Sequence, residues 1–163
     1  MTYSAGARAH VTSDNPLVQY IVRWRLWEAL RRATKAAHGR ISSQSRVLIL
    51  CAGEGLEGTV FCDSGYKDVT VSDISEVGVA EALKRDARLK GLVLNAECAN
   101  LERNSFDIVI VQDGLHHLQN PVLGFTEMLR MATTAAIFLE PHDSLVGRTI
   151  GTKWEKNGQA INY

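Results

Sequence analysis

A glycine-spaced turn follows a short apolar segment, and an aspartate ends the next such segment. The turn holds Gly53, Gly55 and Gly58 after residues 47–50, and Asp73 lies about twenty residues further on, the distance expected of a ribose-binding acid. Glycine has no Cβ, so the backbone of such a turn can bend sharply and approach a ligand closely. The helix expected after the turn presents unpaired N–H groups at its start. This layout predicts a nucleotide-cofactor cleft in which the Asp73 carboxylate binds a ribose.

The spacing also fits a dinucleotide fingerprint, so two cofactor classes compete for this turn. Glu54 and Glu57 would repel a pyrophosphate, whereas a ligand with sulfonium and ammonium groups meets no such repulsion. The charges of the turn therefore favour a cationic cofactor over a nicotinamide dinucleotide.

A second group of reactive side chains follows the last two apolar segments, residues 106–111 and 135–139. Its members are Asp113, His116, His117, Glu140, His142 and Asp143. If both segments are parallel strands, their carboxyl ends meet at one edge of the sheet, and these side chains can gather at the mouth of the cleft. His116 or His117 could then take a proton from an acceptor, since imidazole titrates near pH ~6.5; a packed residue at a helix start is the alternative for one of them. The spacing matches no metal-ligand motif, so no metal is expected.

The elements that must position these groups alternate along the chain. Apolar runs predict strands at residues 47–50, 69–71, 92–94, 106–111 and 135–139, and helices are expected at residues 55–64, 76–90, near Ala99 and 121–131. Pro121 suits the first turn of the last helix. Strands that are apolar on both faces and alternate with helices predict an α/β fold, a Rossmann-like open parallel sheet with helices on both faces.

The N-terminal region divides into two parts. Residues 1–14 lack periodicity and predict a flexible arm, and residues 15–40 predict one long helix that Gly39 ends. Its apolar positions are expected to pack on the core or on a partner over much of the girth of the helix. They include Leu17, Tyr20, Ile21, Trp24, Trp27, Leu26 and Leu30. Arg25, with Arg32 and Lys35, is interpreted as part of a solvated face rather than a nucleic-acid patch.

The composition narrows the class of protein. The 163 residues are 45% hydrophobic and 22% charged, which fits a single globular domain. Lys and Arg balance Asp and Glu to a net charge of zero, so no overall field favours nucleic acid or an anionic membrane. No apolar run approaches the roughly 18 residues of a membrane span, and no signal-peptide core begins the chain, so a cytoplasmic protein is expected. The three cysteines, Cys51, Cys62 and Cys98, are expected to be reduced thiols.

Four segments carry a resemblance to the class I S-adenosylmethionine-dependent methyltransferases, especially their small-molecule group. They are residues 50–55, 71–75, 95–101 and 104–118, and the last places Leu-His-His-Leu after a strand. The resemblance covers roughly residues 42 to 142. The resemblance implies a cofactor-binding core, here residues 41–143, that uses S-adenosylmethionine to methylate an O, N or C centre of a small-molecule acceptor.

The resemblance also implies where the cofactor lies. The backbone of Cys51, Ala52, Gly53 and Gly55 would line its methionine end, and Asp73 would accept hydrogen bonds from both ribose hydroxyls.

The adenine and the methyl donor would meet a second set of residues. Ile74 would pack against the adenine ring, Glu97 would accept a hydrogen bond from the adenine amino group, and Cys98 would offer a backbone N–H to the ring. Gln112 would lie along the cofactor near the methyl donor.

The chain departs from the family pattern at two positions and at its end. Ile49 stands where the family usually has an acid, and Cys51 where it usually has a glycine. Residues 144–163 do not contain the two further strands that the family adds, which predicts a C-terminally truncated fragment or a minimal variant. Two alternatives therefore remain at this point: a degenerate cofactor-binding or interaction module without catalysis, and a nicotinamide-dependent oxidoreductase.

Overall fold

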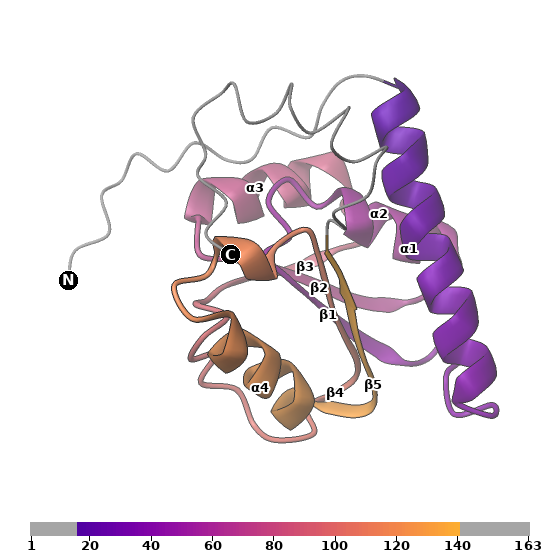
Figure 1. The fold of residues 1–163 in the computed structure, drawn as a ribbon. Coiled ribbons are helices and arrows are strands. Elements are labelled where there is room, and N and C mark those ends of the chain that lie inside the picture. Colours follow the sequence, from indigo (N-terminus) through magenta and orange to yellow (C-terminus); the bar gives the residue numbers. More distant parts are fainter. Residues whose placement is uncertain (1–15, 141–163) are drawn as a thin grey trace, which may run out of the picture.

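A five-stranded parallel sheet forms the centre of the molecule in a computed structural model, which describes residues 16–140 (Figure 1). The strands are β1 (Arg46–Leu50), β2 (Asp68–Asp73), β3 (Lys90–Val93), β4 (Phe106–Gln112) and β5 (Ala132–Leu139). They lie in the order β3-β2-β1-β4-β5, and every neighbouring pair is parallel. The predicted Rossmann-like α/β architecture is thus confirmed, with each strand close to its expected position.

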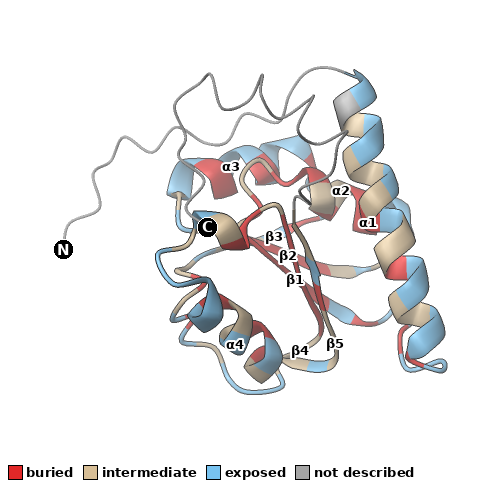
Figure 2. Cartoon of the chain, in the orientation of Figure 1, coloured by how far each residue is buried: buried red, intermediate tan, exposed pale blue. Residues whose placement is uncertain are grey.

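Helices cover both faces of this sheet. They are α1 (Pro16–Ala36), α2 (Leu56–Asp63), α3 (Glu76–Arg85) and α4 (Pro121–Met131), and a 3₁₀ turn, η1 (Leu115–His117), precedes α4. The structure shows why both faces are covered, because alternate residues of the strands enter two separate apolar clusters. One cluster joins Leu26 of α1 and Phe61 of α2 to one face, and the other joins Met128 of α4 to the opposite face. The central strands β1, β2 and β4 are largely buried between them (Figure 2).

Side-chain caps fix where two of the helices begin. The Ser75 hydroxyl accepts a hydrogen bond from the N–H of Gly78 at the start of α3, and Asn120 accepts one from the N–H of Leu123 at the start of α4. Pro121 occupies the first turn of α4, as predicted. Both caps follow the carboxyl end of a strand, so they also set the loops that border the site.

Two helix predictions are wrong. The helix expected at residues 76–90 ends at Arg85, because the Asp86 carboxylate accepts hydrogen bonds from the Arg88 backbone and side chain and turns the chain. Gly91 lies inside β3 instead of ending a helix, and a Cβ there would come within 2.6 Å of Val79. The helix expected near Ala99 is a turn, which the Asn95 side chain holds through the N–H of Glu97.

Helix α1 buries less of its surface than its sequence predicts. Leu26 and Leu30 enter the core, but Trp24 and Trp27 remain 54% and 53% exposed. Trp24 and Trp27 line a shallow groove against α2, together with Tyr20 and Val60. The helix ends at Ala36, four residues earlier than expected, and Asn15 lies outside the described residues. None of the helices within residues 16–140 is long and apolar enough to cross a bilayer.

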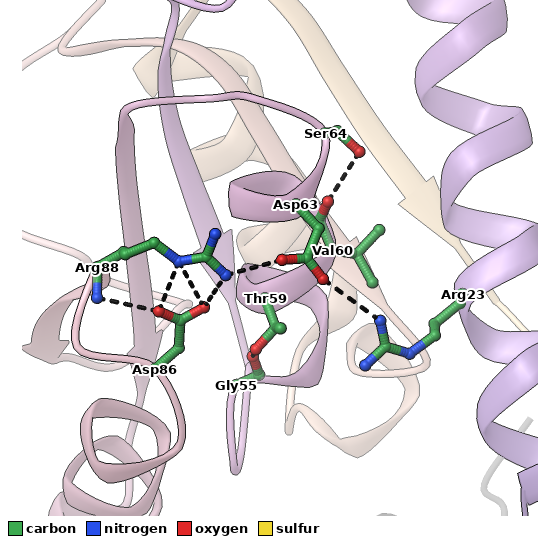
Figure 3. Close-up of polar contacts among 8 residues, drawn as sticks. All are labelled: Arg23, Gly55, Thr59, Val60, Asp63, Ser64, Asp86 and Arg88. Carbon is green, nitrogen blue, oxygen red and sulfur yellow. Dashed lines mark hydrogen bonds and ion pairs between the residues drawn. The ribbon is translucent and has the colours of Figure 1, made fainter.

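A chain of ion pairs connects α1, the end of α2 and the turn that follows α3. Asp63, at the end of α2, pairs with Arg23 of α1 and with Arg88, and Arg88 also pairs with Asp86 (Figure 3). These groups are at the second half of α2, away from the glycine turn. They link α1 and α2 to the turn after α3 and are not part of the candidate site.

Candidate functional site

The glycine turn and Asp73 meet at the carboxyl ends of β1 and β2. The Asp73 carboxylate accepts hydrogen bonds from the N–H of Gly53 and from the N–H of Ser75, both at 2.9 Å. A carboxylate has about four acceptor positions, so both oxygens can still accept hydrogen bonds from a ligand. Ala52 donates its N–H to the Ser72 carbonyl at 2.9 Å, which joins the same two loops a second time. The structure therefore brings the predicted ribose acid and the predicted cofactor turn together.

The turn uses left-handed backbone conformations at three positions. The φ angles of Cys51, Gly53 and Gly55 are 53°, 49° and 76°. For Cys51 this conformation costs about 1–2 kcal/mol, because its Cβ crowds the following carbonyl. Burial raises the pKa of the Cys51 thiol to about 12, and the charge of Asp73 adds to the effect, so the thiol is not a nucleophile at neutral pH.

The glycines of the turn also serve the packing of the protein itself. A Cβ on Gly55 would lie 2.5 Å from the Cβ of Ala82 in α3, and a Cβ on Gly58 would lie 2.7 Å from Val71 in β2. These two glycines therefore let α2 approach α3 and the sheet closely. Sequence reasoning assigned the spacing to ligand approach alone and missed this second role.

The acids and a histidine that follow β4 and β5 do gather, as predicted. Glu140 accepts hydrogen bonds from the N–H groups of Gly114 and Leu115, at 3.2 and 2.8 Å, and its other oxygen lies 2.5 Å from Nδ1 of His116. Asp113 is joined to this group through the N–H that it donates to the Leu139 carbonyl. His142 and Asp143, predicted for the same cluster, lie outside the described residues.

The pair of His116 and Glu140 shifts both titrations. The hydrogen bond to Glu140 raises the pKa of His116, and partial burial opposes the rise. Burial by itself would raise the pKa of Glu140, but the hydrogen bonds from His116 and from the two backbone N–H groups lower it overall. Because Nδ1 faces the carboxylate, Nε2 is the nitrogen left to exchange a proton with a ligand. The His117 ring is exposed, 4.0 Å from the His116 ring between centroids.

Helix α1 supplies a residue that the sequence interpretation placed elsewhere. Arg25 donates two hydrogen bonds to the Asp113 carboxylate, at 2.8 and 3.0 Å, and one to the Glu140 carbonyl. It is thus part of the site border and not of a solvated face. The partners are 88 residues apart in sequence, so no local pattern could have found the pair.

The residues predicted for the adenine end lie along the neighbouring loops. Ile74 is 49% exposed after β2, which leaves its surface available for a ring. Glu97 accepts a hydrogen bond from the N–H of Asn120 at 2.7 Å, and the N–H of Cys98 is already donated to the Asn95 carbonyl. Cys98 would therefore have to share this N–H with an adenine, and its role remains a prediction.

Gln112 ends β4 beneath α1 and is buried. Its side-chain N–H donates to the Val22 carbonyl at 3.3 Å, while its Oε1 atom has no hydrogen-bond partner among residues 16–140. A buried acceptor without a donor is costly to the fold. A ligand that carries N–H donors would satisfy this oxygen, and the predicted place of Gln112 near the methyl donor remains a prediction.

The two acids of the turn carry less negative charge than the sequence predicts. The Glu54 carboxylate is paired with Arg85 at 2.9 Å, and burial raises the pKa of Glu57 to about 7. The negative charge on the turn is therefore smaller than two free carboxylates would give. A pyrophosphate bound at the turn would therefore meet less repulsion than the sequence predicts. Within residues 16–140, no group of three or more His, Cys, Asp or Glu side chains is arranged to hold a metal ion.

Comparison with known sequences identifies relatives of this region. Residues 48–139 match the model of a family described as a methyltransferase domain. Over 107 residues the chain is 37% identical to the demethylmenaquinone methyltransferase of Beutenbergia cavernae. The matched region is 66% of this chain and 42% of that protein, so the chain spans less than half the length of this relative.

Comparison with solved structures shows the same fold. An S-adenosylmethionine-dependent methyltransferase of Thermotoga maritima, described as a possible histamine N-methyltransferase, superposes with a TM-score of 0.63 at 19% identity and covers 90% of this chain and 64% of its own. The (4+2)-cyclase SpnF superposes with a TM-score of 0.54 at 21% identity, over 65% of this chain and 42% of its own. Because a cyclase shares the fold, the architecture alone does not determine the reaction.

Proposed function

The chain belongs to the methyltransferase-domain family, whose cofactor is S-adenosylmethionine, and from this premise we propose that it methylates an oxygen, nitrogen or carbon centre of a small molecule. The observation that carries the proposal is the joining of Asp73 to the glycine turn, through the hydrogen bond from the N–H of Gly53. This contact sets an acceptor for a vicinal diol beside a turn whose backbone can approach a ligand. The family match, over residues 48–139, includes both Asp73 and the glycine turn.

The cofactor would supply a methyl group on a sulfonium, and the protein would supply position. Asp73 would hold the ribose, Ile74 would cover the adenine ring, and the backbone from Cys51 to Gly55 would line the methionine end. An in-line displacement gains most from fixed geometry and from exclusion of water, so few catalytic groups are needed. Ile49 is buried in the core and Cys51 adopts a left-handed backbone conformation, so neither departure removes a residue to which the proposal assigns one of these contacts.

His116 is the candidate general base for an acceptor that must lose a proton. The Glu140 carboxylate holds the ring at Nδ1, which keeps Nε2 available to take a proton. An acceptor that is already a neutral amine would not need this step. His117 is the other candidate for the general base, and because it is exposed it is the weaker candidate of the two.

Isothermal titration calorimetry with S-adenosylhomocysteine tests the proposal. The protein is expected to bind this ligand and not a nicotinamide dinucleotide. Asp73→Asn is expected to weaken binding at least about tenfold, since one charged acceptor is lost. Glu76→Gln, in the exposed first turn of α3, is the matched control and is expected to bind as the wild type does.

Two results would count against the proposal. Binding of the nicotinamide dinucleotide alone would support an oxidoreductase, and equal binding by Asp73→Asn and the wild type would place the ligand elsewhere. A melting curve of each variant shows that a loss of binding is not a loss of fold.

A further inference from the structure

Glu57 is an acid to which the proposed function assigns no role. It lies in the first turn of α2, two residues after Gly55. Glu57, Val60 and Ser64 recur three and seven residues apart, so they share one face of the helix. Val60 and Ser64 line the groove against α1. Glu57 therefore lies on the α1 side of α2, one turn nearer to the glycine turn.

The cations around Glu57 are engaged with other groups. Arg85 donates to the Glu54 carboxylate and to the Glu54 carbonyl, both at 2.9 Å. Arg25 donates to Asp113 and to the Glu140 carbonyl. Within residues 16–140, no cationic side chain forms an ion pair with Glu57, and Arg85 lowers the pKa of this carboxyl through its charge without a hydrogen bond. Such an acid is costly to keep charged, and a cationic ligand would lower that cost.

Gln112 provides a second acceptor on the same side of the sheet. Ile108, Ile110 and Gln112 alternate along β4, and the two isoleucines belong to the apolar cluster that includes α1 and α2. Oε1 of Gln112 faces no donor in the described chain. Among residues 16–140, the α1–α2 side of the sheet thus holds one carboxylate without a cationic partner and one buried amide oxygen without a donor.

An alkylammonium group satisfies both requirements, since it carries a positive charge and three N–H donors. A sulfonium has a charge but no N–H, so it could not satisfy Gln112. We propose that the Glu57 carboxylate pairs with the α-ammonium group of the bound cofactor, with Oε1 of Gln112 as a second acceptor. This inference rests on the function proposed above and assigns the residue that anchors the amino-acid end of the ligand.

A thermodynamic cycle between ligand and protein tests the pairing. Calorimetry would compare S-adenosylhomocysteine with its analogue in which hydrogen replaces the amino group, on the wild type and on Glu57→Gln. Removing the amino group is expected to weaken binding to the wild type at least about tenfold, the size of a charge-assisted hydrogen bond. The same change is expected to weaken binding to Glu57→Gln by a clearly smaller factor, because only the neutral acceptors, among them Gln112, are left for the amino group. Glu76→Gln, in the exposed first turn of α3, is the matched control and is expected to keep the wild-type ratio.

The possible outcomes separate this inference from the proposed function. A Glu57→Gln variant that keeps the full wild-type ratio would overturn the pairing and leave the cofactor site intact. A wild type that binds neither ligand would overturn both.

A second measurement uses only the wild-type protein, so it tests the pairing even if Glu57→Gln fails to fold. Pairing with an ammonium group ionises the Glu57 carboxyl, so titrations near pH 7 in two buffers of different ionisation enthalpy should show proton release with S-adenosylhomocysteine and less with the analogue. The charged groups that act on Glu57 are Asp113 after β4 and Arg85 of α3, with Arg25 of α1 beside Asp113. Equal proton release with both ligands would contradict the pairing.

Discussion

Two carboxylates hold the loops of the candidate site by accepting backbone hydrogen bonds. Asp73 accepts from Gly53 and Ser75, and Glu140 accepts from Gly114 and Leu115. Each acid thus fixes the loop that carries the proposed ligand contacts before any ligand binds. Preorganisation of this kind lowers the entropic cost of binding. Substitution of either acid is expected to change loop shape as well as ligand contact, so isosteric amides, Asp73→Asn and Glu140→Gln, are the appropriate replacements.

Glu57 is expected to reduce the stability of the protein at alkaline pH. Burial raises the pKa of this carboxyl to about 7, above the value near ~4.5 of an unfolded chain. The folded state therefore binds more protons than the unfolded state between these values, and its stability falls as the pH rises through this window. Glu57→Gln is expected to raise the free energy of unfolding by about 1 kcal/mol at pH 8 and to change it little at pH 4.

Urea denaturation at the two pH values measures this difference. Glu76→Gln serves as the exposed control and is expected to show no pH-dependent gain. A Glu57→Gln variant that is less stable than the wild type at pH 8 would show that the carboxylate has a stabilising partner.

His116 is expected to stay protonated to higher pH than a free histidine. The hydrogen bond to Glu140 raises its pKa, so the stability that the pair contributes is complete below the unfolded value near ~6.5 and is lost as the pH rises through the folded value. Glu140→Gln is expected to lower the pKa of His116. Titration of the imidazole signals by NMR measures both values, and a pKa of His116 that is unchanged in Glu140→Gln would exclude the pair.

At the scale of elements, the contact of α2 with α3 depends on a missing side chain. Gly55 combines a φ of 76° with a virtual Cβ that lies 2.5 Å from Ala82, whereas Gly65 has a φ of 91° and open space around it. Gly55→Ala is expected to destabilise the protein by more than about 2 kcal/mol, because it adds a steric clash to backbone strain. Gly65→Ala is expected to cost about 1 kcal/mol, from strain alone.

Chemical denaturation of the two variants separates clash from strain. Equal losses would mean that α2 can shift away from α3 at little cost. In that case the close approach of these helices would not fix the shape of the turn.

Helix α1 is attached to the site border by Arg25. Arg25→Met is expected to destabilise the protein by about 1–2 kcal/mol, because it leaves Asp113 without its two-point partner at a partly buried position. Arg31→Met is the control on the same helix and is expected to cost less than about 0.5 kcal/mol, since its pair with Glu28 is exposed and Arg32 also binds Glu28. Thermal unfolding measures both, and equal effects would show that the Asp113 pair does not hold α1.

At the scale of the whole molecule, the architecture could be predicted from the sequence because its signals are local. Apolar strand segments alternate with helical ones, and each strand lies close to its predicted position. The errors arose where a side chain overrides the local pattern, as Asp86 does at the end of α3 and Asn95 does near Ala99.

The candidate site could be predicted only in part. Asp73, the glycine turn and the group around His116 follow strand ends, and a parallel sheet brings such positions together. The pair of Arg25 and Asp113 and the isolation of Glu57 depend on how α1 and α2 pack, which no spacing in the sequence encodes. The chain spans 42% of its methyltransferase relative, yet every residue proposed to hold the cofactor lies between positions 51 and 112, inside the described region.

A crystal structure of the protein with S-adenosylhomocysteine is the most direct test of the proposed cofactor site at Asp73 and the glycine turn. We expect the ligand to lie across the carboxyl ends of β1, β2 and β4, with both ribose hydroxyls hydrogen-bonded to the Asp73 carboxylate and the adenine ring packed on Ile74. We also expect its amino group to lie within hydrogen-bond distance of Glu57. A ligand bound away from Asp73 and the Gly53–Gly55 turn, or a crystal soaked to saturation with no ligand density at this edge, would contradict it.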